Sequence, residues 1–126
     1  MPSPVAHSLA GVAFSRLQPG AKPSLLGWRG ILATVIAANL ADIDFAFEAL
    51  SRVFPGVIEA SHREWTHSLM AAVVFALGVL LFAWVRRLDR PLLWALFLGC
   101  AYVSHLILDI FTYTPRNPGG VPLFWP

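Results

Sequence analysis

Residues 69–85 read LMAAVVFALGVLLFAWV, residues 92–111 read LLWALFLGCAYVSHLILDIF, and these two apolar stretches decide the fold. The first is 17 residues without a polar side chain, near the lower limit for a helix that crosses a bilayer. The second is 20 residues long and apolar except for Ser104, His105 and Asp109. The connection between them, residues 86–90, is short and contains three arginines. We therefore expect an antiparallel pair of membrane-spanning helices.

The composition agrees with a membrane protein rather than a soluble one. Of the 126 residues, 57% are hydrophobic and 13% are charged, and the mean hydropathy is +0.67. Soluble domains carry about 25% charged residues, and a chain of this length forms one domain. A soluble fold this small could not bury so much apolar surface. The net charge of +2, without a basic run, gives no reason to expect a nucleic-acid partner.

The rest of the chain predicts two more helices. Residues 5–17 form a short apolar segment, and residues 28–45 predict a third span. The tail 112–126 is rich in proline and glycine, so it is expected to be irregular. We expect a single all-α domain over residues 1–126. Its fold would be an integral membrane helical bundle of about three transmembrane helices plus a short N-terminal helix, with an oligomeric state that the sequence leaves open.

The positive charges predict an orientation. An up-down-up arrangement places the arginines of residues 86–90 on the same side as Arg16, Lys22 and Arg29, which precede the third span. Arginine and lysine are enriched in cytoplasmic loops. We therefore assign the 86–90 connection to the cytoplasm, and the polar loop 51–66 to the opposite side.

Folding the two apolar stretches as a hairpin brings histidines and aspartates into one layer, at the end remote from the basic connection. The 28–50 helix runs antiparallel to residues 69–85, so its carboxyl end reaches the same layer. The layer contains six side chains of the metal-binding type: Asp42, Asp44, His62, His67, His105 and Asp109. This convergence predicts a metal site on the non-cytoplasmic side.

Two pairs of residues carry most of that prediction. His105 and Asp109 are four residues apart, share a helix face and could bind one ion from adjacent turns. An ionisable residue within a span is costly and usually functional, although a helix-packing hydrogen bond of His105 is an alternative. Asp42 and Asp44 point about 200° apart in a regular helix. We expect one to bind the metal, with Asp44 preferred, and the other to support it or end the helix; two solvated acids are the alternative.

The segment 62–68 reads HREWTHS and adds candidate catalytic residues. One of His62 and His67 is expected to complete the metal shell, while the other moves protons or lies at the surface. Arg63 could hold a substrate anion such as phosphate, or lie at the membrane interface. Thr66 is a candidate N-cap of the following helix. His7 alone would be a structural histidine, and it becomes a candidate ligand only together with the others.

The mixture of imidazoles and carboxylates suits zinc or another divalent transition metal such as manganese. Calcium or magnesium would call for ligands that are mainly oxygen atoms. A metal ion with an open position lowers the pKa of bound water and polarises a carbonyl or phosphoryl oxygen. Metal-dependent hydrolysis is therefore the expected chemistry.

These motifs resemble, in chain order, the YdjM-like family of inner-membrane, metal-dependent hydrolases. The resemblance rests on His7, Asp42-Ile43-Asp44, His62-Arg63-x-x-Thr66-His67-Ser68, Ser104-His105-Leu106-x-Leu108-Asp109-x-x-Thr112 and the tail Gly120-Val121-Pro122-Leu123-Phe124-Trp125-Pro126. It spans nearly the whole chain, and it implies a location in the bacterial inner membrane. Family members usually continue with another hydrophobic segment after this tail, so we expect a short or truncated member.

The family is similar, more distantly, to the all-helical zinc phospholipase C and single-strand nuclease superfamily, which hydrolyses phosphoesters. Carried over, the metal ligands would be His7, Asp44 or Asp42, His62 or His67, His105 and Asp109, with Asp109 as a metal bridge. The soluble enzymes have a further HxxxE-type segment that is missing here. The resemblance therefore implies one or two ions rather than three.

We expect the chain to hydrolyse a phosphoester of a lipid or a small amphiphile in contact with membrane lipid. One rival is a non-catalytic metal-binding or metal-transport protein, which would need a polar path that residues 69–85 do not offer. Another is a structural membrane protein with a buried polar network, which would bind no metal.

Overall fold

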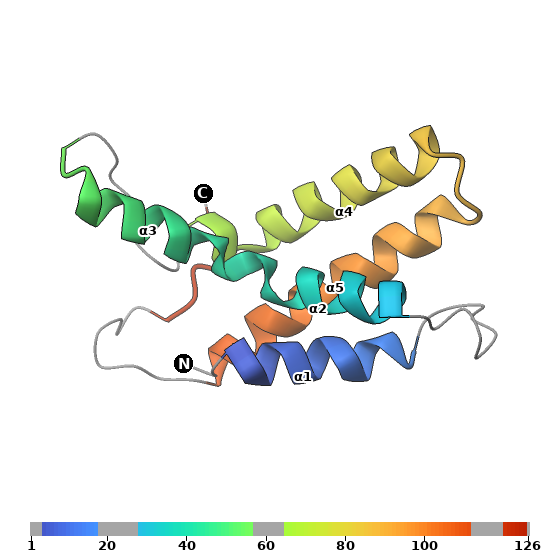
Figure 1. The fold of residues 1–126 in the computed structure, drawn as a ribbon, viewed down its shortest axis with the longest axis horizontal. Helices are drawn as coiled ribbons and strands as arrows, with labels where there is room; N and C mark the ends of the chain where they lie inside the picture. Colours follow the sequence, from blue (N-terminus) through green and yellow to red (C-terminus); the bar gives the residue numbers. More distant parts are fainter. Residues whose placement is uncertain (1–3, 18–27, 57–64, 112–119, 126) are drawn as a thin grey trace.

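The computed structural model describes residues 4–17, 28–56, 65–111 and 120–125. Its elements are α1 (Pro4–Ser15), α2 (Trp28–Asn39), the 3-10 turn η1 (Leu40–Ile43), α3 (Asp44–Val53), the 3-10 turn η2 (Trp65–His67), α4 (Leu69–Val85) and α5 (Pro91–Ile110). All of them are helical (Figure 1), which confirms the all-α prediction for the described residues.

Two helical segments are long and apolar enough to cross a membrane: Trp28–Val53, which joins α2, η1 and α3, and Pro91–Ile110. The helix α4 has the bounds that were predicted, Leu69–Val85, but only 17 residues. At 1.5 Å per residue it is about 25 Å long, shorter than a hydrocarbon core of about 30 Å. The structure therefore gives two candidate spans and a shorter apolar helix, where about three spans were predicted.

The interior of the bundle is built from small side chains. Most buried apolar positions are alanines: Ala37, Ala38, Ala41, Ala72, Ala83, Ala95 and Ala101. Large apolar residues of α4, such as Val74, Leu77 and Leu81, are exposed instead. Small residues at helix contacts and large apolar residues outside are the arrangement of helices packed in lipid, because lipid gives Leu and Val no reason to be buried.

The helix α5 lies at the centre, in contact with α4, α2 and α1. It forms an antiparallel hairpin with α4, and α1 lies beside α2 (Figure 1). The close approach of α1 to α2 depends on Gly11, because a Cβ there would come within 2.7 Å of the Cα of Val35. The end of α1, the start of α2 and the α4–α5 turn lie at one end of the molecule (Figure 1). The segments that contain Arg16, Arg29 and the arginines of residues 86–90 therefore lie at the same end of the molecule, while Lys22 lies outside the described residues.

The other end of the bundle is formed by η1, η2 and the last turn of α5. There the chain changes direction between α2 and α3, through the 3-10 turn η1 (Figure 1). The backbone amide of Leu69 donates to the carbonyl of Leu123 at 2.9 Å, which ties residues 120–125 to the start of α4. The N-cap of α4 is Ser68, whose hydroxyl accepts from the amide of Ala71 at 3.1 Å. The prediction that Thr66 is this N-cap was wrong, because the N-cap lies two residues later, at Ser68, and Thr66 is buried.

Candidate metal centre

Five side chains of the metal-binding type meet at the end where η1 and η2 lie. They come from four elements: His7 from α1, Asp42 from η1, His67 from η2, and His105 and Asp109 from α5. Four of the five are buried, and only the side chain of Asp42 retains 17% exposure. The structure therefore places five of the candidate residues close together.

The two imidazoles of His67 and His105 form the middle of the cluster. Their Nε2 atoms lie 3.3 Å apart. An oxygen of Asp109 lies 3.4 Å from Nε2 of His67 and 3.9 Å from Nε2 of His105. An oxygen of Asp42 lies 3.7 Å and 3.5 Å from the same two nitrogens. The ligand atoms form two overlapping groups, each compact enough for one ion: His67, His105 and Asp109, and His7, Asp42 and His105.

The outer nitrogens of both rings decide the tautomers. Nδ1 of His105 lies 2.9 Å from the backbone carbonyl of Ala38, which can only accept, so this nitrogen carries the proton. Nδ1 of His67 lies 3.2 Å from Asp44 and 3.1 Å from the hydroxyl of Thr66, which gives its own proton to Asp44 at 2.7 Å. Nε2 of each ring then faces the other ring and nearby carboxylate oxygens. A ring whose Nδ1 is held in this way can offer Nε2 to a metal ion.

The same neighbours determine the pKa of His67. Burial lowers the pKa of this imidazole, but hydrogen bonds with the three neighbouring aspartates, Asp109 foremost, outweigh burial and raise the pKa from 6.5 to about 10. Without a metal ion, the cluster therefore keeps a proton on His67 at neutral pH. A divalent cation could take the place of that proton.

His7 completes the cluster from α1. Its ring stacks on that of His105, with centroids 3.7 Å apart and planes inclined by 19°. Its Nε2 lies 3.6 Å from Asp109, and its Nδ1 has no hydrogen-bond partner among the described residues. A buried imidazole nitrogen without a partner is costly. Nε2, the nitrogen that faces Asp109, is the atom of His7 that could bind a metal ion.

The break between α2 and α3 positions the two aspartates. In a regular helix Asp42 and Asp44 would diverge, but the 3-10 turn η1 ends between them and both reach His67 from different sides. Asp42 faces Nε2 and belongs to a group of ligand atoms, whereas Asp44 faces Nδ1. Asp44, which was the preferred ligand, thus lies behind His67 rather than among the grouped ligand atoms.

Three supporting residues were not predicted. Thr66 binds Asp44, and the hydroxyl of Tyr102 donates to the carbonyl of Thr66. Asn39 donates to the hydroxyl of Ser8 at 3.2 Å, next to His7, and so joins α2 to α1. Tyr102 could have been suspected, because it lies three residues before His105 on the same helix face. The remaining predicted site residues, His62 and Arg63, lie outside the described residues.

The comparisons with known proteins bear on the family. The family model for the YdjM inner membrane protein matches residues 1–126. No curated protein and no solved structure matches the chain. The match covers all of the segments on which the resemblance was based. The chain therefore belongs to the YdjM inner membrane protein family.

Proposed function

We propose that this inner-membrane protein is a metal-dependent hydrolase, with one or two divalent ions held between His67 and His105. Zinc is the ion that fits best, and manganese is the alternative. The observation that carries the proposal is the cluster in which Nε2 of His67 and Nε2 of His105 lie 3.3 Å apart, each within 3.9 Å of carboxylate oxygens of Asp42 and Asp109. Ligand-type atoms this close together are compact enough to hold one ion.

The spacing of the ligand atoms supports the choice of metal. Donor atoms around a tetrahedral zinc ion lie about 3.3 Å apart. The distances of 3.3 Å from Nε2 of His67 to Nε2 of His105, and of 3.4 Å to Asp109, are of this order. In this proposal His67, His105, Asp109 and Asp42 hold the metal, and His7 either joins them or holds a second ion. A bound divalent cation would supply a water of lowered pKa and would polarise the bond to be hydrolysed.

The surrounding residues orient the ligands. Asp44 and the carbonyl of Ala38 fix the two rings through Nδ1, so that both Nε2 atoms point inward. Asp42, the most exposed ligand in the described cluster, marks the side from which a substrate would approach. His62 and Arg63 keep their predicted roles, a proton carrier and an anchor for phosphate, as part of the proposal.

The substrate class follows from the location. A metal centre in an inner-membrane protein has lipids as its neighbours, and a divalent ion is suited to phosphoesters. We propose a lipid-like phosphoester as the substrate, with α4 as a third transmembrane helix and the metal centre on the non-cytoplasmic side.

The first test is the metal content of the detergent-purified protein, measured by elemental mass spectrometry. Wild-type protein should contain near-stoichiometric zinc or manganese, and His105→Ala and Asp109→Ala should lose it. Ser104→Ala is the matched control, because among the described residues this hydroxyl bonds only the carbonyl of Ala101 on its own helix. The metal-loaded protein should hydrolyse phosphoesters, and this hydrolysis should stop when a chelator removes the metal. Absence of metal even after reconstitution with zinc and manganese would refute the hydrolase and leave a structural polar network.

A further inference from the structure

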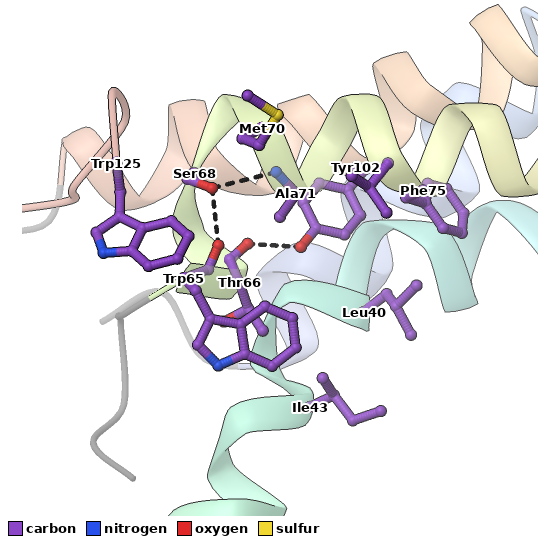
Figure 2. A pocket seen from close by; sticks show the side chains of 11 residues that line it. Leu40, Ile43, Trp65, Thr66, Ser68, Met70, Ala71, Phe75, Tyr102 and Trp125 are labelled. Carbon is purple, nitrogen blue, oxygen red and sulfur yellow. Dashed lines mark hydrogen bonds between the residues drawn. The ribbon is translucent and has the colours of Figure 1, made fainter.

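A groove lies beside the candidate metal centre, on the outer side of η2 (Figure 2). Its volume is about 380 Å³, within the range of roughly 300–1,000 Å³ that small-molecule sites occupy. One face of α4 forms its long wall, through Ala71, Val74 and Phe75, and the N-cap Ser68 stands at its start. The opposite wall comes from η1, and Tyr102 of α5 closes the bottom.

The lining selects a hydrocarbon occupant. Its hydroxyl groups belong to Thr66, Ser68 and Tyr102, and all three donate to acceptors inside the protein. Figure 2 shows the bonds from Ser68 and from Tyr102. The other lining side chains are apolar, apart from the indole nitrogens of Trp65 and Trp125 at one end. A polar ligand would lose its hydrogen bonds to water without gaining new ones along the groove. An alkyl chain makes no hydrogen bonds to water, so it would lose none on entering the groove.

The groove is continuous with the surface that an inner-membrane protein turns to lipid. Met70 and Val74 line it and are more than half exposed, and the outer face of α4 continues through Leu77 and Leu81. Trp65 and Trp125 are half exposed and stand at the end near η2 (Figure 2). Tryptophans of this kind are enriched where a bilayer meets water. A chain could therefore enter from the bilayer while its head group stays near the interface.

The same end of the groove adjoins the metal centre. Thr66 lines the groove, binds Asp44 and directly precedes His67. Leu40 and Ile43 also line it, and between them in η1 lies Asp42, the most exposed ligand of the described cluster. A molecule with an apolar tail in the groove would hold its head group at the approach to the metal.

We propose that this groove binds one acyl chain of a membrane phospholipid and thereby presents its phosphoester to the metal centre. The presentation of the phosphoester rests on the proposed function, whereas the chain site depends only on the groove. The bilayer is as apolar as the groove, so transfer of the chain adds little affinity. The groove acts by orientation, which alone can change the rate of a reaction about 100-fold.

The test uses a matched pair of substitutions in α4. Val74→Trp places an indole in the groove, and Val73→Trp adds the same exposed indole at the same depth outside the lining. The probe is phosphatidylglycerol with a diazirine in one acyl chain, in vesicles of phosphatidylethanolamine and phosphatidylglycerol. Photolabelled residues are mapped by peptide mass spectrometry. Labelling of residues 65–75 and Tyr102 should fall about fivefold or more in Val74→Trp, because the indole takes the volume of the chain.

The controls separate this inference from the hydrolase. Val73→Trp and His105→Ala should keep the labelling pattern of wild type, since neither residue lines the groove. Ala71→Leu is a milder second variant, which should reduce labelling while metal content stays unchanged. Hydrolysis of the long-chain lipid should fall about tenfold in Val74→Trp, whereas hydrolysis of a short water-soluble phosphoester should be preserved.

Equal labelling of the two valine variants, or crosslinks to a second copy of the chain, would overturn the acyl-chain site. If the groove is labelled but the protein binds no metal, only the hydrolase proposal is overturned.

Discussion

His67 is the residue on which the charge balance of the site depends. In the metal-free protein its pKa lies near 10, so Nε2 carries a proton at neutral pH. That proton stabilises the metal-free fold; the stabilisation is complete below the unfolded pKa of 6.5 and is lost as the pH rises through about 10. A metal ion can bind Nε2 only after this proton has left, so metal binding and deprotonation are coupled.

This coupling predicts proton release on metal binding. At about pH 7.5, zinc should displace close to one proton from His67, and the apparent affinity should rise up to about tenfold per pH unit until the pH approaches 10. Titration calorimetry in buffers of different ionisation enthalpy counts the protons. His67→Gln should abolish this release. Zinc binding to wild type without proton release would contradict the charge balance that we derive.

Asp44 should support the metal without binding it. Asp44→Asn keeps the shape of the side chain but weakens its hold on Nδ1 of His67, so zinc affinity should fall about 10- to 100-fold. Asp42→Asn should have the larger effect, because its oxygen faces both Nε2 atoms. Glu48→Gln, on the same helix as Asp44, removes an ion pair with Arg52, its one ion pair among the described residues, and serves as the control. Competition with a zinc chelator measures the affinities, and an equal loss in Asp42→Asn and Asp44→Asn would refute this division of roles.

The residues of the site were predictable to the extent that helix periodicity fixes them. The spacing of His105 and Asp109, and the hairpin that brings His67 beside them, follow from regular helices. The choice between Asp42 and Asp44 does not, because it depends on a local change from α-helix to 3-10 turn. The contact of Tyr102 with Thr66 joins residues 36 positions apart, and no local pattern marks it.

At the scale of elements, the position of His7 depends on how closely α1 approaches α2. Gly11 lies one turn after His7, and a Cβ there would meet the backbone of Val35 at 2.7 Å. A side chain at this position could be accommodated only if one helix moved, since the atoms in contact belong to the backbone. The approach of these two helices therefore sets the distance of His7 from the rest of the cluster.

Two glycine substitutions test this dependence. Gly11→Ala should destabilise the fold by about 1–3 kcal/mol through overpacking, and it should also lower metal content by moving His7. Gly78→Ala, in α4, has open space around its Cβ and should be neutral or stabilising by up to about 1 kcal/mol. Thermal unfolding in detergent, followed by circular dichroism, compares the two. Equal melting temperatures would show that α1 can shift without cost.

The elements themselves differ in how well a sequence pattern marks them. The bounds of α4 follow from an unbroken apolar run between Ser68 and Arg86. The change between α2 and α3 has no such mark, because residues 31–53 contain neither proline nor glycine. There the chain leaves the α-helix where Asp42 meets the two imidazoles. Tertiary contacts override local propensity at that point.

At the scale of the whole molecule, the distribution of side chains is that of a protein with lipid around it and a polar cluster at one end. Alanines fill the helix contacts, and large apolar residues face outward. Arginines gather at the α4–α5 turn, whereas the described cluster of His7, Asp42, His67, His105 and Asp109 lies at the other end of α5, and Figure 1 shows these two ends of the helix. If α5 crosses the membrane, these two ends lie on opposite sides of it.

This polarity predicts the orientation. Arginines favour the cytoplasmic side, so the α4–α5 turn should face the cytoplasm and residues 120–125 the other side. In a Cys100→Ala background, Asp89→Cys and Phe124→Cys place single exposed thiols at the two ends. A membrane-impermeant maleimide should label Asp89→Cys only in inverted vesicles and Phe124→Cys only in right-side-out vesicles. If instead Asp89→Cys is labelled only in right-side-out vesicles and Phe124→Cys only in inverted vesicles, the metal centre lies on the cytoplasmic side. Labelling of both thiols from one side would mean that α5 does not cross the membrane, and the bundle would then have to lie within one leaflet.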